Sequence, residues 1–189
     1  MRHPTMRKII NSTYMTLDGA IEGPHLWPKL RAPSDERAAA IQMELLDTCD
    51  SVLMGRRTYD VMASAWPSRS GDRLSERMNS IRKLVVSNTL ENAGWNNTTI
   101  MSGDVGHQLE ELKNESGQNI VQYGFGSVSR LLMERGLLDE LRLWLYPQTV
   151  GTRSFAELFA ANATEAQFTL AGSTALSNGI IVLRYVIAR

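Results

Sequence analysis

Residues 51–59 read SVLMGRRTY, an apolar run that ends at Gly55 and passes at once into two arginines and a threonine. The run before the glycine has the composition of a short buried strand, and a helical pattern continues to about Ala65. The first N–H groups and the positive dipole end of such a helix attract anions, and Gly55 lets a ligand approach the main chain. Arg56 and Arg57 can each add charge-assisted hydrogen bonds worth roughly 1.5–3 kcal/mol. The stretch therefore predicts a phosphate site; the alternative is that both arginines are ordinary surface charges.

Residues 120–128, IVQYGFGSV, repeat this order of strand, glycine turn and helix, with Ser127 placed to cap the helix. They do not form the Rossmann fingerprint, because Ser129 stands where G-x-G-x-x-G needs its third glycine. Alone, the pattern is also typical of a tight turn. Two such turns at the carboxyl ends of parallel strands, where open α/β sheets bind ligands, together predict a dinucleotide site.

A third predicted strand ends in residues 85–89, VVSNT. The small hydroxyl and amide side chains of Ser87, Asn88 and Thr89 suit a ribose or its phosphate. The same residue types are common in turns, so turn formation is the alternative interpretation.

Short β-rich runs alternate with amphipathic helical patterns up to Gly136, which predicts a largely parallel sheet with helices on its faces. The last third of the chain has no convincing long helix between its final two strands, and Asn178-Gly179 carries a hairpin signal. We therefore expect an α/β fold with an antiparallel C-terminal part. The expected strands are 7–14, 51–54, 83–87, 98–102, 119–123, 140–147, 167–175 and 180–187. The expected helices run from an N-cap at Ser34 to about 48, from 56 to 65, from 74 to 80, from a cap at Asp104, and from 128 to 135.

The composition is that of an ordinary globular domain, which we assign to residues 1–189 with 1–6 as a loose N-terminal extension. Lys+Arg and Asp+Glu number 20 each, so no broad charge footprint favours nucleic acid or a membrane surface. Cys49 is the only cysteine, which excludes an intrachain disulfide and a cysteine-based zinc cluster. The first residues lack the long apolar run of a signal peptide, so we expect a cytoplasmic protein.

Six stretches carry a resemblance to a known family through their order and spacing. They are 14–19 (YMTLDG), 54–59 (MGRRTY), 85–89 (VVSNT), 124–127 (GFGS), 136–141 (GLLDEL) and 147–151 (PQTVG). Together they resemble the dihydrofolate-reductase-like superfamily, and more closely the RibD C-terminal domain family, the reductase half of a bifunctional deaminase-reductase. The resemblance implies a mixed, mostly parallel central sheet flanked by helices, NADPH as hydride donor, and a homodimer.

The resemblance also implies which residues contact NADPH. The cofactor phosphates would lie at Gly55, Arg56, Arg57 and Thr58. The adenosine ribose and its 2′-phosphate would lie along Ser87, Asn88 and Thr89. The pyrophosphate and nicotinamide ribose would lie over Gly124, Gly126, Ser127 and Val128, and the nicotinamide would border Thr13, Ala20 and Ile21.

The chain departs from the family pattern in two places. The second turn has Phe125 where dihydrofolate reductases have a small residue, so this ring either narrows the pocket or faces the core. The H-x-E and P-C-x-x-C motifs of the zinc deaminase half are absent, which removes a specific argument for riboflavin synthesis.

The chemistry needs a proton source beside the nicotinamide, and Asp18 is the candidate acid, with a turn aspartate as the alternative. Asp35 and Glu36 could serve a pterin ring, but acids in a first helical turn are explained by the helix dipole. Trp27 and Trp66 are candidates to wall a heterocyclic substrate, or else packing aromatics. We expect no metal, since His107 and Glu111 read as a solvated helix pair.

The expected function is therefore an NADPH-dependent reductase that transfers a hydride to a small heterocyclic or ribosyl-type carbonyl or imine. It resembles 5-amino-6-(5-phosphoribosylamino)uracil reductase. Dihydrofolate reductase is the alternative enzyme, and a non-catalytic NADPH-binding sensor is the alternative of another class.

Overall fold

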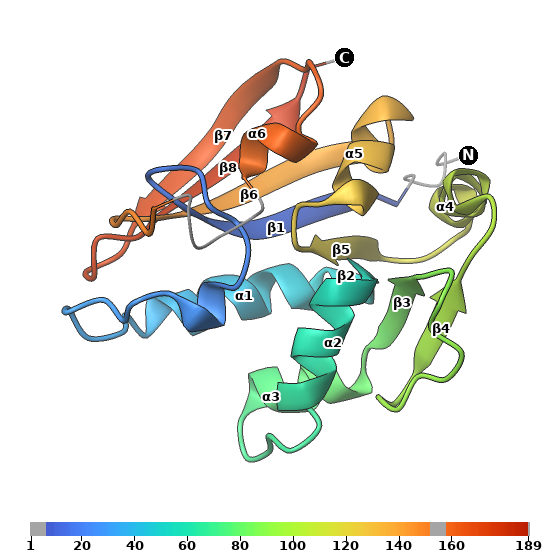
Figure 1. The fold of residues 1–189 in the computed structure, drawn as a ribbon, viewed down its shortest axis with the longest axis horizontal. Helices are drawn as coiled ribbons and strands as arrows, with labels where there is room; N and C mark the ends of the chain where they lie inside the picture. The colour runs from blue at the N-terminus through green and yellow to red at the C-terminus, as the bar shows by residue number, and fades with distance from the viewer. Residues whose placement is uncertain (1–6, 152–157, 189) are drawn as a thin grey trace, which may run out of the picture.

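An eight-stranded sheet forms the centre of the protein in a computed structural model that describes residues 7–151 and 158–188 (Figure 1). The predicted N-terminal extension, residues 1–6, lies outside the described residues. The strand order is β4-β3-β2-β5-β1-β6-β8-β7. The strands are β1 (Ile9–Thr16), β2 (Cys49–Gly55), β3 (Arg82–Val86), β4 (Thr98–Met101), β5 (Asn119–Tyr123), β6 (Leu138–Tyr146), β7 (Phe168–Ala175) and β8 (Ile181–Ile187).

Helices cover both faces of this sheet (Figure 1). They are η1 (Pro24–Leu26), α1 (Arg37–Asp47), α2 (Arg56–Ala65), α3 (Arg73–Ser80), α4 (Val105–Asn114), α5 (Ser127–Glu134) and α6 (Phe159–Asn162). Ile10 and Val121 pack into the core under α1, α2 and α3, whereas their neighbours Ile9 and Ile120 pack into the core under α4 and α5. Apolar residues therefore follow one another in the central strands, because both faces are buried.

The first six strands pair in parallel and the last two pair antiparallel, which confirms the predicted fold class. β8 runs antiparallel to both β6 and β7. The predicted hairpin joins β7 to β8, where Leu176 N–H donates to Ile180 O at 2.8 Å and Gly179 has φ 87°. A glycine adopts this left-handed conformation without strain.

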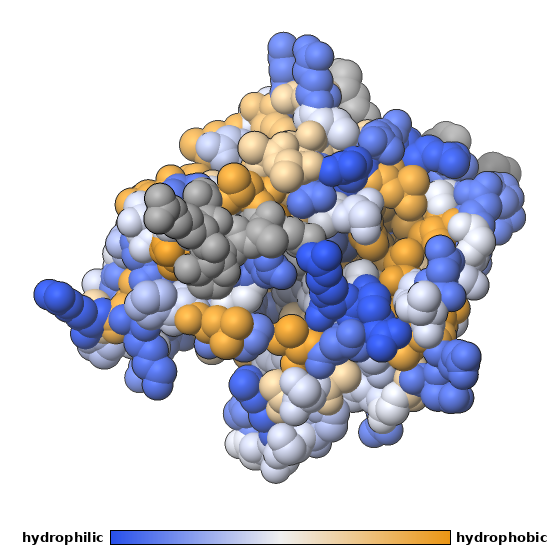
Figure 2. Space-filling model, in the orientation of Figure 1, coloured by the Kyte–Doolittle hydropathy of each residue, from blue (hydrophilic) through white to orange (hydrophobic). Residues whose placement is uncertain are grey.

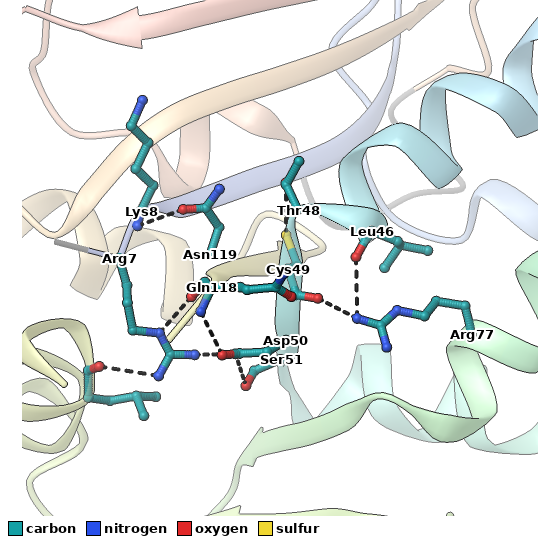
Figure 3. Close-up of polar contacts among 11 residues, drawn as sticks. Arg7, Lys8, Leu46, Thr48, Cys49, Asp50, Ser51, Arg77, Gln118 and Asn119 are labelled. Carbon is teal, nitrogen blue, oxygen red and sulfur yellow. Dashed lines mark hydrogen bonds and ion pairs between the residues drawn. The ribbon is translucent and has the colours of Figure 1, made fainter. Parts of the chain in front are cut away.

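A network of side chains fastens the strands at their amino ends (Figure 3). The buried Arg7 guanidinium pairs with Asp50 and donates to Gln118 O at 2.7 Å. Asp50 in turn accepts from Gln118 N–H at 2.8 Å, and Arg77 donates to Cys49 O. These bonds tie β1, β2 and β5 together at the edge opposite to their carboxyl ends, so this end of the sheet is structural.

Two predicted helix caps were wrong. Ser34 does not cap α1, because the helix begins at Arg37 with Glu36 at the N-cap and no side-chain bond. The preceding Asp35 instead accepts from Arg37 N–H at 2.9 Å and from Ser177 N–H at 2.7 Å, which fixes the entry to α1 on the β7–β8 hairpin. Ser127 is the first residue of α5 and not its cap, since Gly126 holds that position.

The described helices are short. The longest, α1, has 11 residues, and none in the described part of the chain is both long and apolar enough to cross a membrane, which takes roughly 20 residues.

Candidate functional site

The two predicted glycine turns lie side by side at the carboxyl edge of the sheet. β2 and β5 are adjacent and parallel, with Met54 opposite Tyr123, so Gly55 and Gly124 leave the same edge at the same level. The chain then enters α2 on one face of the sheet and α5 on the other. A ligand that bridges both turns would therefore lie across the end of the sheet.

The two turns are in direct contact. Gly124 has φ 79°, and a Cβ built there would lie 2.5 Å from Thr58 Oγ1 of α2. A Cβ at Gly55 would lie 3.4 Å from Val128 Cγ2 of α5. The missing side chain of Gly124 thus leaves room for the first turn of α2, and that of Gly55 leaves room for the first turn of α5. A side chain at position 124 would force the two glycine turns apart.

Both helices begin without a side-chain cap. Their N-cap residues, Gly55 and Gly126, have no side chain to accept from the first N–H groups of α2 and α5. By contrast, Asp72 caps α3 and Asp104 caps α4. Since first-turn N–H groups have no partner within a helix, two adjacent uncapped N-termini are a candidate site for anions.

The two arginines stand at the entry of α2. Arg56 Nε lies 2.8 Å from Asp60 Oδ1 one turn further along the helix. Arg57 NH1 lies 3.8 Å from Glu22 Oε1, so the loop after β1 reaches the start of α2. In Figure 2 strongly hydrophilic side chains gather over this end of α2, beside a hollow near the centre of the face. The positive charge is therefore placed where the uncapped helix begins.

The end of β3 lies on the other side of Gly55, because Val86 is its register partner. Ser87 is buried, and its Oγ accepts from Thr89 N–H at 3.2 Å and Leu90 N–H at 3.0 Å. Ser87 therefore forms a turn, as the alternative interpretation held. Asn88 and Thr89 are exposed, and their predicted contact with a ribose phosphate stays a prediction.

A cavity of about 280 Å³ adjoins α5 on this side. It is lined by Val86, Gly103, Asp104, Val105, Gly106, Ser127, Val128, Leu131 and Arg135. Sequence reasoning found Ser127 and Val128 but missed the wall formed by α4. Gly103 carried a usable signal, because a glycine between a strand and a helix repeats the pattern of the other two turns.

The loop after β1 packs against the second glycine turn. Ala20 is fully buried and pairs with Leu158, and Ile21 packs in one cluster with Phe125. The Phe125 ring stacks on Phe159 of α6 with the ring centroids 4.1 Å apart, so Phe125 faces the core. Thr13 is buried and pairs with Leu143 of β6.

The carboxylate of Asp18 anchors a neighbouring loop. It accepts from Thr16 Oγ1 at 2.5 Å, from Gly151 N–H at 2.8 Å and from Val150 N–H at 3.2 Å. These hydrogen bonds, with that of Thr16 the strongest cause, lower the pKa of Asp18. An ionised carboxylate with three donors is suited to hold a loop rather than to release a proton. The catalytic role of Asp18 stays a prediction.

The family model of the RibD C-terminal domain matches residues 7–182. The chain belongs to the RibD C-terminal domain family. The YyaP protein of Bacillus subtilis (strain 168), itself described as uncharacterized, is 25% identical over 183 residues, 95% of this chain and 94% of YyaP.

Solved structures show that this RibD C-terminal domain has a dihydrofolate-reductase-like fold. A pyrimidine reductase-like protein of Corynebacterium diphtheriae superposes with a TM-score of 0.70 at 12% identity, over 97% of this chain and 92% of that protein. A Thermotoga maritima diaminohydroxyphosphoribosylaminopyrimidine deaminase/5-amino-6-(5-phosphoribosylamino)uracil reductase has a TM-score of 0.65 at 13% identity. This second match covers 97% of the chain and 57% of the Thermotoga protein.

The two tryptophans predicted to wall a substrate lie in different parts of the RibD C-terminal domain. Trp27 is buried, donates to Glu22 O at 2.9 Å and packs its ring on Tyr146 with centroids 5.4 Å apart. Trp66 follows the last residue of α2 and stacks under Arg69. A helix of ten residues is about 15 Å long, which places Trp66 at the end of α2 remote from Gly55.

Sequence reasoning missed three tyrosines at the carboxyl ends of β1, β5 and β6. Tyr123 directly precedes Gly124, and Tyr14 lies with its ring centroid 5.4 Å from that of Tyr146. Burial raises the pKa of each of these three phenols, so all keep their protons at neutral pH. Tyr14 Oη accepts from Gln42 Nε2 of α1 at 2.5 Å.

His107 and Glu111 form an exposed pair on α4, with His107 Nε2 3.3 Å from Glu111 Oε1. Among the described residues no group of three or more histidine, cysteine or acidic side chains is placed to hold a metal ion.

Proposed function

We propose that this RibD C-terminal domain binds NADPH across its two glycine turns and reduces a small heterocyclic or ribosyl-type carbonyl or imine. The observation that supports the proposal is the contact between Gly124 and Thr58, which brings two uncapped helix N-termini together at one edge of the sheet. Two adjacent anion sites match a ligand with two linked phosphates. The two turns continue on one side into a cavity of about 280 Å³.

The residues present fit such a cofactor. The first-turn N–H groups of α2 and α5 and the hydroxyl of Thr58 would hold the pyrophosphate. Arg56 and Arg57 supply positive charge at the start of α2, in reach of a third phosphate. The adenosine end would lie toward Ser87 and the cavity beside α5, and the nicotinamide end toward Ala20 and Ile21.

When bound, NADPH supplies a hydride to an electrophilic carbon of the substrate. The reduced oxygen or nitrogen also requires a proton. Tyr14 and Tyr123 offer phenol groups near the nicotinamide end, and because burial raises the pKa of both, they suit hydrogen bonding to the substrate better than proton transfer. The transferred proton then comes from solvent. Trp27 and Tyr146 help to exclude bulk water from this region.

The test is a titration of the purified protein with NADPH and with NADH, followed by nicotinamide fluorescence and thermal midpoint. We expect a preference for NADPH of at least about tenfold, equivalent to about 1.4 kcal/mol. Arg57→Ala and Arg56→Ala should weaken NADPH more than NADH where the side chain touches the 2′-phosphate, and both cofactors equally where it touches the pyrophosphate. Arg69→Ala, beyond the other end of α2, is the matched control. Absence of binding up to millimolar cofactor would refute the proposal.

A second candidate function is cofactor binding without catalysis. It is favoured by the engagement of Asp18, the predicted acid, with three donors. This candidate predicts NADPH binding but no NADPH oxidation with any carbonyl, pterin or pyrimidine substrate. Dihydrofolate reduction has less support, because Asp35 accepts hydrogen bonds from Arg37 and from Ser177 N–H rather than facing a ligand.

A further inference from the structure

The carbonyl oxygen of Gly124 lies at the centre of a buried network of hydrogen bonds. It accepts from Asn11 Nδ2 at 2.7 Å, from Gln122 Nε2 at 2.7 Å and from Ser129 Oγ at 3.3 Å. The single hydroxyl proton of Ser129 is shared between this oxygen and Gln122 Oε1, which lies 3.0 Å from Ser129 Oγ, and Asn11 Nδ2 also donates to Gln122 Oε1. Asn11 and Ser129 have 0% exposure and Gln122 has 1%. Donors from β1, β5 and α5 therefore converge on one peptide oxygen.

This network is unusual for its place in the fold. Asn11 and Gln122 are register partners in two central parallel strands, on the face where Ile9 and Ile120 pack into the apolar core. Asn11 Oδ1 is buried and has no hydrogen-bond partner among the described residues. An unpaired buried oxygen destabilises a fold, and an apolar side chain of similar size would avoid the loss. The asparagine is therefore best explained by what its amide N–H groups hold.

Fixing this oxygen also fixes the next N–H group. The described residues contain no cis peptide bond, so the Gly124 carbonyl and the Phe125 N–H of the same peptide unit point in opposite directions. With the oxygen directed into the network, the Phe125 N–H is directed away from it. This N–H has no acceptor among the residues that the structure describes. It stands in the turn that precedes the uncapped start of α5.

We propose that Asn11, Gln122 and Ser129 are positioning residues that orient the Gly124–Phe125 peptide so that its N–H donates to a phosphate of the cofactor. The inference rests on the proposed function, because it takes the pyrophosphate of NADPH as the acceptor. The three side chains act through the peptide and do not touch the ligand themselves. Removing one of them weakens phosphate binding by releasing the peptide plane.

Two variants test the role through binding affinity. Gln122→Met removes every hydrogen bond of the Gln122 amide at similar side-chain length, including the bond from Nε2 to Tyr123 O. Ser129→Ala removes one buried hydroxyl with little risk to folding. Matched controls are Asn79→Leu, which removes an amide holding the carbonyls of Trp66 and Arg69, and Ser75→Ala, which removes a buried hydroxyl in α3. We expect roughly tenfold weaker binding of NADPH and of inorganic pyrophosphate for Gln122→Met. The controls should lower the thermal midpoint while leaving both dissociation constants within about twofold.

The Phe125 amide itself gives a second readout. The chain has four phenylalanines, so selective ¹⁵N-phenylalanine labelling yields at most four amide signals, and Phe125→Leu identifies the one of interest. NADPH should shift the Phe125 amide proton downfield, and Ser129→Ala should reduce that shift. If the wild-type protein binds NADPH while this signal stays in place, or if Ser129→Ala and Ser75→Ala bind it equally well, the positioning role is overturned and the proposed function stands. If the wild-type protein binds neither NADPH nor pyrophosphate, both are overturned.

Discussion

Replacing Gly124 with alanine tests the contact on which the site depends. Gly124 has φ 79°, in the left-handed region, and its α-hydrogen side faces Thr58. The new methyl would lie 2.5 Å from Thr58 Oγ1, well inside contact distance, while Thr58 Cβ would lie at an ordinary 3.6 Å. The substitution therefore adds backbone strain and a steric clash that involves a single oxygen atom.

The two effects can be estimated separately. A left-handed alanine costs about 1–2 kcal/mol relative to a relaxed one, and an inserted methyl group in a packed site costs about 1–3 kcal/mol. Their sum centres near 3–4 kcal/mol, which corresponds to a fall in thermal midpoint of roughly 6–16 °C in a domain of this size. Gly136→Ala is the matched control, because it has φ 63° and nothing within 4 Å of the new Cβ. It should show the backbone cost alone.

A double-mutant cycle separates the clash from the strain. In a Thr58→Ala background the offending oxygen is gone, so Gly124→Ala should cost no more than Gly136→Ala. The assay is urea denaturation of the four proteins of the cycle and the control, followed by far-ultraviolet circular dichroism. An unchanged cost of Gly124→Ala in the Thr58→Ala background would refute the contact between the two turns.

Three further predictions concern titratable groups. Burial lowers the pKa of Lys83 to about 8, against 10.5 in the unfolded chain, so the free energy of unfolding should rise as pH increases between these values. Lys83→Met should abolish this rise. Parallel pH profiles for the wild-type protein and Lys83→Met would contradict the prediction. Burial raises the pKa of the Cys49 thiol to about 11, so this single cysteine should resist alkylation at pH 8 in the native protein. It should react once urea unfolds the protein. Fast alkylation of the native protein would contradict the prediction and show that the thiol is accessible. Asp18→Asn should lower the free energy of unfolding at neutral pH relative to the wild-type protein. The pKa of Asp18 is lowered in the folded protein, so its stabilising charge is lost as pH falls through this lowered pKa. The two proteins should therefore be equally stable in acid. A loss of NADPH oxidation without a loss of stability would instead support the predicted catalytic role of Asp18.

Local patterns were sufficient to predict most of the sheet and both glycine turns. The run before Gly55 and the run before Gly124 are short, apolar and followed at once by helical patterns, so strand, turn and helix are each specified by adjacent residues. Parallel strands then place both turns at one edge without further information. The antiparallel hairpin at Gly179 was predicted for the same reason.

Features set by distant residues could not be predicted. The start of α1 depends on Asp35 meeting Ser177 N–H, and the direction of Phe125 depends on Phe159. Neither partner is near in sequence, so no local rule reveals them. The remote position of Trp66 follows from the length and direction of α2. The polar pair Asn11 and Gln122 did carry a signal, since each amide directly follows two apolar residues of its strand, at 9–10 and at 120–121.

The strand order also has a consequence for folding. β5 lies between β1 and β2, although its residues follow both in the chain, and Asn11 meets Gln122 across 111 residues. During synthesis β1 and β2 therefore emerge long before the strand that joins them, and both keep an unpaired edge until residues 119–123 have left the ribosome. Such non-local pairing slows folding, because a long loop must close before its contacts form. We expect the insertion of β5 to be the step that commits the chain to its native sheet.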